Sequence, residues 1–174
     1  RAADLRRRRF GWLDRRAIRK VRRLITPSAW DRDRLLEAGV DRDKLFVVRP
    51  AVAPCPDVDA TGFRRQAGIP AEAPLLMSVG HFNHPNRHRD AIWAFEIVQY
   101  VERSVQLALI GDGPYRERIT GDYHSTRGHG GHSLGARAEA STLIQHADIV
   151  LAAHRRHGGT CTTLEAMAAG RAVV

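Results

Sequence analysis

The feature that most constrains the fold is a regular alternation of short apolar runs with helix-like segments from residue 74 onward. The runs PLLMSVG (74–80), VQLALIG (105–111) and DIVLAA (148–153) are continuously apolar. Strands of this kind are buried on both faces, as in a parallel sheet that helices cover on both sides. The sequence therefore predicts an α/β fold with a Rossmann-like parallel sheet between two layers of helices.

The segments between these runs carry helix and loop signals. Apolar side chains recur at helical spacing within residues 89–103, namely at Ile92, Phe95, Ile97, Val98 and Val101. Pro114 follows a Gly-Asp-Gly turn and suits the start of a further helix. Residues 121–131 are polar and rich in glycine, and we expect them to form a loop.

A smaller strand, helix and strand precede this region. Leu24-Ile25-Thr26 and residues 45–48 are apolar runs, Ser28 suits the N-cap of the helix between them, and Gly39 suits its end. Residues 50–60 contain three prolines and no periodicity, which is typical of a linker.

The net charge of +9 belongs to one segment. Residues 1–23 hold eleven of the 28 Lys and Arg residues and two of the 19 Asp and Glu residues, so the remaining charges balance. Such a segment suits a solvated surface or an anionic membrane surface, and no nucleic-acid motif accompanies it.

No apolar run reaches the roughly 20 residues of a membrane span. Cys55 and Cys161 are distant, and we expect two free thiols in a reducing cytoplasm.

In an open parallel sheet, ligands bind beyond the carboxyl ends of the strands. One stretch there follows Gly80 and contains Arg87 and Arg89, which with backbone N–H groups suit a phosphate, although an ordinary polar loop has the same composition. His81, His84 and His88 raise the alternative of a metal site. No cysteine or further carboxylate besides Asp90 completes a ligand set, so we predict no metal.

Two more stretches follow predicted strands. Gly111 and Asp112 form a tight turn of a kind common to α/β proteins. Gly158 and Gly159 allow close backbone approach to a ligand, before a helix that begins near Thr160. Glu165 lies on that helix, where side chains lean toward the N-terminus. Its carboxylate among apolar neighbours requires a partner, either ligand hydroxyls or a nearby arginine, and the residues leave both open.

The order of these pieces resembles the group 1 (family 4) retaining glycosyltransferases of the GT-B fold. The matching pieces follow one another along nearly the whole chain: LITPSAWDRDRLLEAGV, DKLFVVRPAV, FRRQAGIP, PLLMSVG, AIWAF, LALIGDGPYRERI, SLGA, HADIVLAA and GGTCTTLEAMAAGRAVV. The resemblance implies that residues 1–50 end an acceptor-binding domain, that residues 51–73 are a linker and first helix, and that residues 74–174 are a truncated nucleotide-sugar domain. We therefore expect a fragment, incomplete at both ends and inactive alone.

The resemblance also implies the site. Glu165 would bind the ribose hydroxyls of the nucleotide, and His157 stands at the catalytic position where the family has a glutamate seven residues earlier. His81 and Asn86 stand where the family has an arginine and a lysine that neutralise the diphosphate, and Arg87 is one residue later. The donor-binding set is Gly80, His81, Asn86, Arg87, Gly111, Asp112, Gly158, Gly159, Thr160 and Glu165.

The implied activity is a hexosyltransferase reaction with retention, from a nucleoside diphosphate sugar to a lipid-linked or polysaccharide acceptor. The nucleotide sugar is a substrate, and no cofactor or nucleic acid is expected. The implied location is the cytoplasm, with residues 1–23 in peripheral contact with the inner membrane. The alternative is a degenerate, non-catalytic binding module, because His81, Asn86 and His157 depart from the family pattern. A sugar-nucleotide epimerase of the same fold is a third interpretation, which LEAMAAG disfavours.

Overall fold

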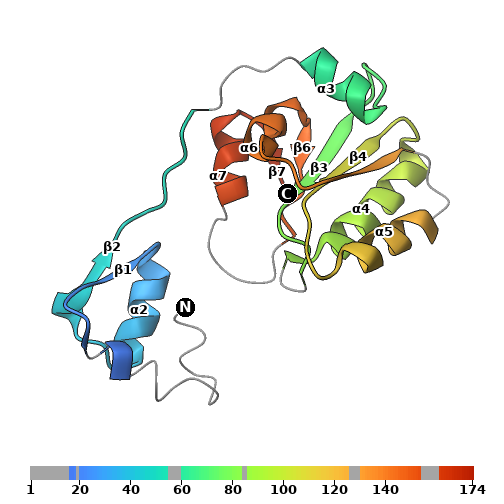
Figure 1. The fold of residues 1–174 in the computed structure, drawn as a ribbon. Coiled ribbons are helices and arrows are strands. Elements are labelled where there is room, and N and C mark those ends of the chain that lie inside the picture. The colour runs from blue at the N-terminus through green and yellow to red at the C-terminus, as the bar shows by residue number, and fades with distance from the viewer. Residues whose placement is uncertain (1–15, 19, 55–59, 84–85, 126–129, 154–160) are drawn as a thin grey trace. The chain divides into compact units, whose positions relative to one another are not determined.

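The computed structural model describes residues 16–18, 20–54, 60–83, 86–125, 130–153 and 161–174. The chain divides into two compact units, Arg1–Ala51 and Val52–Val174 (Figure 1). The acceptor and donor roles that the sequence suggests for these parts stay predictions, because the division into units by itself says nothing about ligands.

The first unit has the predicted strand, helix and strand. β1 (Leu24–Thr26) pairs in parallel with β2 (Leu45–Val47), and between them lie α2 (Ala29–Glu37) and the short 3-10 helix η2 (Arg42–Lys44). The Ser28 hydroxyl accepts a hydrogen bond from the Asp31 N–H at 3.1 Å, so Ser28 is the N-cap. Gly39 follows the helix with φ 83°, the left-handed conformation that ends many helices. Both cap predictions are confirmed.

The second unit contains a five-stranded sheet in the order β5-β4-β3-β6-β7, and every pairing within it is parallel. Its strands are β3 (Leu75–Val79), β4 (Gln106–Ile110), β5 (Gly131–Gly135), β6 (Ile149–Val150) and β7 (Ala172–Val173). Its helices are α3 (Ala60–Ala67), α4 (His88–Val101), α5 (Arg116–Ser125), α6 (Ala140–Leu143), the 3-10 helix η4 (Ile144–His146) and α7 (Cys161–Ala168).

The central strands are apolar on both faces, as their continuous apolar runs predict. In β3, Leu75 and Met77 belong to one buried cluster, and Leu76 belongs to another. In β4, Ala108 and Ile110 join the first cluster, whereas Leu107 and Leu109 join the second. Because side chains alternate along a strand, each strand contributes to two cores.

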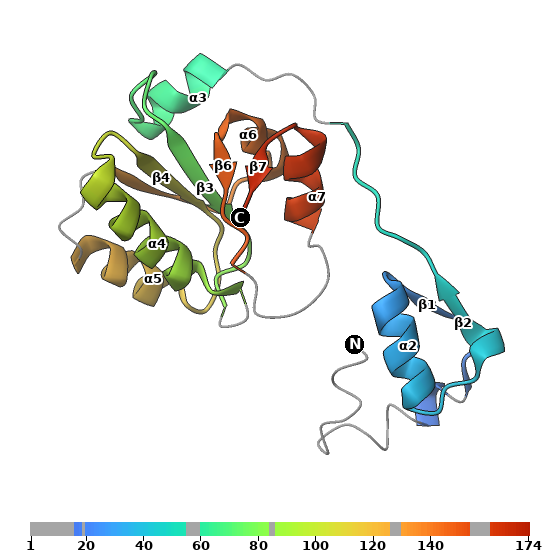
Figure 2. The ribbon, with the colours of Figure 1, turned by 180° about the vertical axis from the view of Figure 1, so that it is seen from behind.

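Helices cover both of these faces (Figure 1 and, from behind, Figure 2). Ile92 and Phe95 of α4 and Ile119 of α5 pack into the cluster that contains Leu76. The opposite cluster includes residues of α3, α6 and α7: Phe63, Ala67, Leu143 and Ala166. The α/β fold with a doubly covered parallel sheet is therefore as predicted.

Two details differ from the sequence expectations. α5 runs to Ser125 and β5 begins at Gly131, so the loop predicted for residues 121–131 is wrong at its first five positions and at its last. Ile119 is fully buried and anchors this helix on the sheet, and such packing outweighs the cost of about 1 kcal/mol for Gly121 inside a helix. In α4, Ile92 and Phe95 are buried, but Ile97, Val98 and Val101 are exposed.

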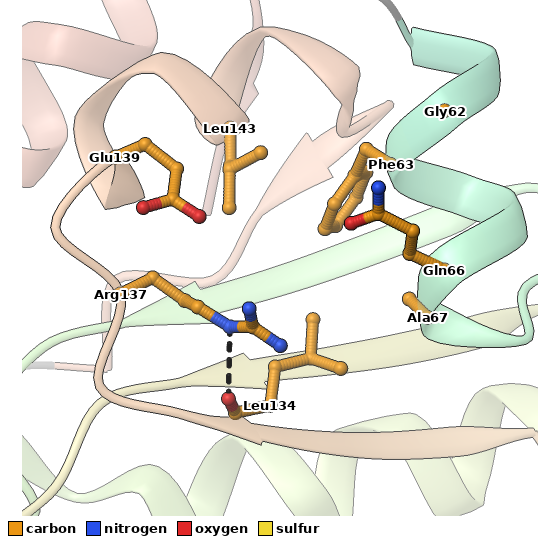
Figure 3. Close-up of a pocket in the computed structure, with 8 residues that line it drawn as sticks. All are labelled: Gly62, Phe63, Gln66, Ala67, Leu134, Arg137, Glu139 and Leu143. Atoms are coloured by element: carbon orange, nitrogen blue, oxygen red, sulfur yellow. Dashed lines mark hydrogen bonds between the residues drawn. The ribbon is translucent and has the colours of Figure 1, made fainter.

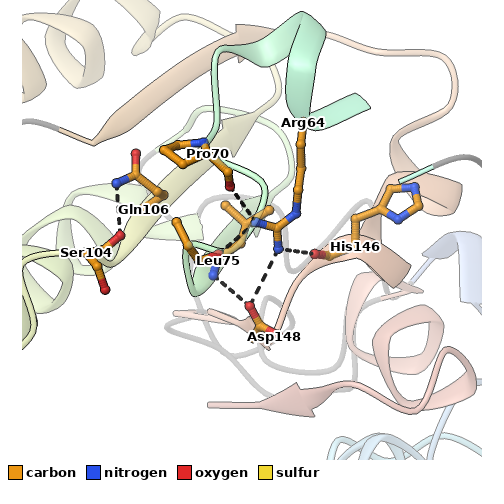
Figure 4. A network of polar contacts seen from close by, with 8 residues as sticks. Arg64, Pro70, Leu75, Ser104, Gln106, His146 and Asp148 are labelled. Carbon is orange, nitrogen blue, oxygen red and sulfur yellow. Dashed lines mark hydrogen bonds and ion pairs between the residues drawn. The ribbon is translucent and has the colours of Figure 1, made fainter. Parts of the chain in front are cut away.

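A polar network joins α3 to the amino ends of two strands (Figure 4). Arg64 Nη1 donates to the carbonyls of Pro70 at 3.1 Å and Ala73 at 2.7 Å. Arg64 Nη2 lies 3.8 Å from Asp148 Oδ2, which accepts a bond of 2.7 Å from the Leu75 N–H. Arg64 thus joins α3 to the loop before β3 and to the start of β6.

We expect Arg64→Met to lower the free energy of unfolding by about 2 kcal/mol, because several backbone acceptors lose a charged donor. The neighbouring Arg65 is exposed, so Arg65→Met is a matched control expected to change stability by less than about 0.5 kcal/mol. Urea unfolding of the three proteins measures the difference. Equal midpoints for the two variants would show that the network does not stabilise the fold.

Candidate functional site

The site region is defined by the order of the strands. The chain adds β4 and β5 on one side of β3 and then returns to place β6 on the other side, where Met77 pairs with Val150. The connection from the carboxyl end of β3 therefore runs toward β4, and the connection from the carboxyl end of β6 runs the opposite way, toward β7. The crevice at such a switch point is where open α/β sheets bind ligands. The connection after β3 includes residues 80–87, and the one after β6 leads to α7.

The loops that follow β3 and β4 are joined by backbone hydrogen bonds. The Gly80 N–H donates to the Ile110 carbonyl at 3.0 Å, and the Phe82 N–H donates to the Asp112 carbonyl at 2.9 Å. The Tyr115 N–H in turn donates to the Phe82 carbonyl at 3.1 Å. Two of the three loops singled out in the sequence thus form one structure.

Glycine permits this close approach. A Cβ atom on Gly111 would lie 1.9 Å from the Gly80 carbonyl oxygen, and one on Gly113 would lie 2.6 Å from the Phe82 carbonyl oxygen. No side chain fits at either place without moving backbone. The structure therefore gives Gly111 a packing role, and its predicted contact with a donor stays a prediction.

His81 and Asn86 lie on the loop after β3. Asn86 Nδ2 donates to the His81 carbonyl at 2.7 Å, and the Asn86 N–H reaches Asn83 Oδ1 at 3.1 Å. The His81 side chain is exposed and lies against Gly113. The Asn86 amide is therefore used to close the loop on itself.

Arg87 precedes α4 in the left-handed conformation, with φ 49° and ψ 38°. This conformation is uncommon for a residue other than glycine. The guanidinium forms an ion pair with Asp90 in the first turn of α4 and is 46% exposed. A cation thus stands at the start of a 14-residue helix, where the helix dipole also favours anions.

Asp112 has a local structural role. Its Oδ1 atom accepts a hydrogen bond from the Gly113 N–H at 2.7 Å, and its Oδ2 atom accepts one from Arg116 at 3.2 Å. These contacts stabilise the turn into α5, and both side chains of the pair are exposed. The predicted ligand contact of Asp112 stays a prediction.

Glu165 lies on α7 next to the fully buried Ala166 and is itself partly buried. Within the described ranges, its carboxylate has no hydrogen bond or ion pair with another side chain. The arginine partner that the sequence left open is thus not found in that part of the chain. Because helical side chains lean toward the N-terminus, we expect the carboxylate to be directed toward the start of α7.

Four predicted site residues lie outside the described residues: His157, Gly158, Gly159 and Thr160. His84, one of the three histidines of the metal alternative, lies outside them as well. Their roles stay predictions.

A small cavity of about 240 Å³ lies between α3 and the segment from β5 to α6 (Figure 3). Phe63 and Leu143 supply apolar walls, and Arg137 Nε donates to the Leu134 carbonyl at 3.1 Å. The remaining lining residues are Gly62, Gln66, Ala67 and Glu139. No residue of the predicted donor site lines this cavity.

The described ranges contain no candidate for a metal site, a disulfide or a membrane-spanning helix. They contain no group of three His, Cys, Asp or Glu side chains that could hold a metal ion. Cys161 is exposed and has no disulfide partner, whereas Cys55 is not among these residues. No helix there is both long and apolar enough to cross a membrane.

Comparison with known proteins assigns the family. No curated protein sequence matches the chain. The family described as glycosyl transferases, group 1, matches residues 73–174, which is more than half of the chain. The chain belongs to this family. The match begins two residues before β3, runs to residue 174 and includes all three predicted donor loops.

Solved structures support the same fold. A mutant of S. aureus TarM in complex with fondaparinux, alpha-GlcNAc-glycerol and UDP has a TM-score of 0.74 at 15% identity, over 92% of this chain and 31% of that one. Anabaena HepE in complex with UDP has a TM-score of 0.71 at 19% identity, over 90% and 45%. WaaG, a glycosyltransferase of lipopolysaccharide biosynthesis, has a TM-score of 0.73 at 18% identity, over 87% and 43%.

This likeness shows that the present chain has the GT-B fold. The chain spans less than half the length of each of these three proteins. What the whole protein transfers, and to what, is therefore a matter for proposal.

One polar contact close to the site was not predicted from the sequence. Ser78 and His88 are both buried, and Ser78 Oγ lies 2.9 Å from His88 Nδ1. Ser78 is the one polar residue in the apolar run PLLMSVG, and that signal could have drawn attention to it. Nothing in the sequence indicated that its partner is a histidine ten residues later.

We expect Gly111→Ala to lower the free energy of unfolding by about 3 kcal/mol, because the added methyl group meets the Gly80 backbone. Gly121 lies inside α5, and a Cβ atom there would meet nothing within 4 Å, so Gly121→Ala is the control and should be stabilising by up to about 1 kcal/mol. Thermal unfolding measures both. A Gly111→Ala protein as stable as the parent would mean that the two loops are not held together in this way.

Proposed function

We propose that the full-length protein transfers a hexosyl group, with retention, from a nucleoside diphosphate sugar to a glycan or lipid-linked acceptor. The observation that carries the proposal is Glu165, a partly buried carboxylate of α7 without a partner in the described part of the chain. Membership of the group 1 glycosyl transferases supports the class of reaction.

Glu165 suits the ribose of the donor. An ionised carboxylate has two oxygens that accept hydrogen bonds and no donor of its own. The two hydroxyls of a ribose supply two donors at a matching separation, and hydrogen bonds to an ionised acceptor are stronger than neutral ones. Binding of the ribose would thus satisfy a carboxylate that is costly to leave half-buried.

The diphosphate would lie at the start of α4. No Arg or Lys stands at positions 81 and 86, so we assign the balancing of the leaving group to Arg87, with Arg89 as the alternative. The Arg87 guanidinium has five N–H donors, so it can keep its pair with Asp90 and still present an edge to phosphate. TarM and HepE were solved with UDP, which makes UDP the first nucleotide to test.

The acceptor side would involve residues 1–50. Arg16, Lys20, Arg22 and Arg23 are exposed, which fits contact with an anionic surface. We place the acceptor at the cytoplasmic face of the inner membrane, with this basic segment in peripheral contact with lipid headgroups.

One observation favours a second function, a non-catalytic binding module. The Asn86 amide bonds within its own loop, and His81 stands where the family has an arginine. Such a site could bind a nucleotide sugar without stabilising the leaving diphosphate. Detection of transferred or hydrolysed sugar from a bound donor separates the two functions.

We expect one of UDP, GDP and ADP to stabilise the full-length protein by about 2.7 kcal/mol at 100 times its dissociation constant. Glu165→Gln should reduce this stabilisation, because an amide oxygen is a weaker acceptor for ribose hydroxyls. Glu117→Gln on the exposed face of α5 is the control. Thermal shift measures all three proteins, and the absence of stabilisation by any nucleotide or its sugar conjugate would contradict the proposed function.

We expect Arg87→Gly to separate binding from stability. Glycine adopts the left-handed conformation without strain, so the free energy of unfolding should stay within about 1 kcal/mol of the parent or rise. Loss of the cation should weaken nucleotide binding at least about fivefold, whereas removal of the exposed Arg103 should not. Isothermal titration measures the affinities. Unchanged affinity in Arg87→Gly would exclude Arg87 from the diphosphate site.

A further inference from the structure

A buried polar pair lies directly beneath the loop after β3. Ser78, in β3, is 2% exposed, and His88, the first residue of α4, is 3% exposed. Their contact, 2.9 Å from Ser78 Oγ to His88 Nδ1, joins the end of β3 to the first residue of α4. Buried polar groups are costly unless they are hydrogen-bonded, so this pair fixes the distance between the end of the strand and the start of the helix.

The His88 ring also supports the loop between them. Nε2 lies 3.5 Å from the point where a Cβ atom on Gly80 would stand, so the ring lies against Gly80. The ring packs edge-on against Phe82, with centroids 4.8 Å apart and an interplanar angle of 68°. Phe82 is the residue whose backbone joins the loop to Asp112 and Tyr115. The imidazole of the first residue of α4 therefore contacts both β3, at Ser78, and the first part of the loop, at Gly80 and Phe82.

We propose that the Ser78–His88 pair is a positioning element of the donor site. It does not contact the donor. It holds the Gly80–Phe82 backbone and the start of α4 in the arrangement that receives the diphosphate, and thereby sets the affinity for the nucleotide. This inference rests on the proposed function, because it concerns the same site.

A merely structural role for the pair makes a different prediction, and a set of variants separates the two. His88→Leu leaves the Ser78 hydroxyl buried without its partner, so it should lower stability under either role. The double variant Ser78→Ala/His88→Leu removes both polar groups, and replacing both partners by apolar groups can be nearly neutral for stability. If the pair positions the loop, affinity should stay low in the double variant even though stability recovers.

Gln106 and His132 supply a matched control. His132 Nε2 lies 2.9 Å from Gln106 Oε1, so this pair has a similar length. Gln106 is the first residue of β4 and stands at the amino end of the strand, away from the predicted donor loops. Gln106→Leu is expected to change stability and to leave nucleotide affinity unchanged.

The experiment measures the dissociation constant of UDP, and of GDP and ADP, by isothermal titration with the full-length protein, together with urea unfolding. We expect affinity to fall roughly five- to tenfold in His88→Leu and in the double variant, as for the loss of about one hydrogen bond. His88→Asn places an amide near the Nδ1 position and should restore part of the affinity.

The outcomes are distinct. Parental affinity in the double variant overturns the positioning role while leaving the proposed function intact. An equal loss of affinity in Gln106→Leu also overturns it, because the effect would then follow general destabilisation. If the parent protein binds none of the nucleotides, the proposed function fails, and the positioning role fails with it.

Discussion

The rest of the structure depends on the burial of β3 and β4 on both faces. Each strand contributes alternate side chains to two separate clusters, so neither layer of helices can be lost without exposing half of the central strands. Every pairing in this sheet is parallel and needs a crossover connection, so the connections that leave the carboxyl ends of the strands meet at the same edge of the sheet. The location of the site therefore follows from the way the core is packed.

At that edge, the described residues of the loop after β3 are held by hydrogen bonds and by packing. Backbone hydrogen bonds join it to the loop after β4, the Asn86 amide closes it, and His88 supports it from below. Backbone that is held in this way loses little conformational entropy when it binds a ligand. Its charge comes from Arg87, which already has Asp90 as a partner. The loop after β3 therefore carries less positive charge than the resemblance to group 1 glycosyltransferases implies, because His81 and Asn86 replace an arginine and a lysine.

Most of the fold could be predicted because it depends on local and periodic signals. The apolar runs identified the strands, and the Ser28 and Gly39 caps bounded the first helix correctly. The loop predicted for residues 121–131 was wrong in its first part, because the anchoring of Ile119 on the sheet outweighed the weak helix propensity of Gly121. The exposure of Ile97, Val98 and Val101 could not be predicted either, since helical spacing alone does not say which face the sheet covers.

The sequence by itself determined the fold class, the family and the three loops that follow apolar strands, because these depend on periodicity and on the order of motifs along the chain. It also identified Glu165 as a carboxylate in need of a partner. Only the tertiary structure decided which loops touch, that Gly111 must lack a side chain, and that Ser78 and His88 meet. Those contacts join residues from different strands and helices, and their distances depend on strand register and helix packing, which no local pattern specifies.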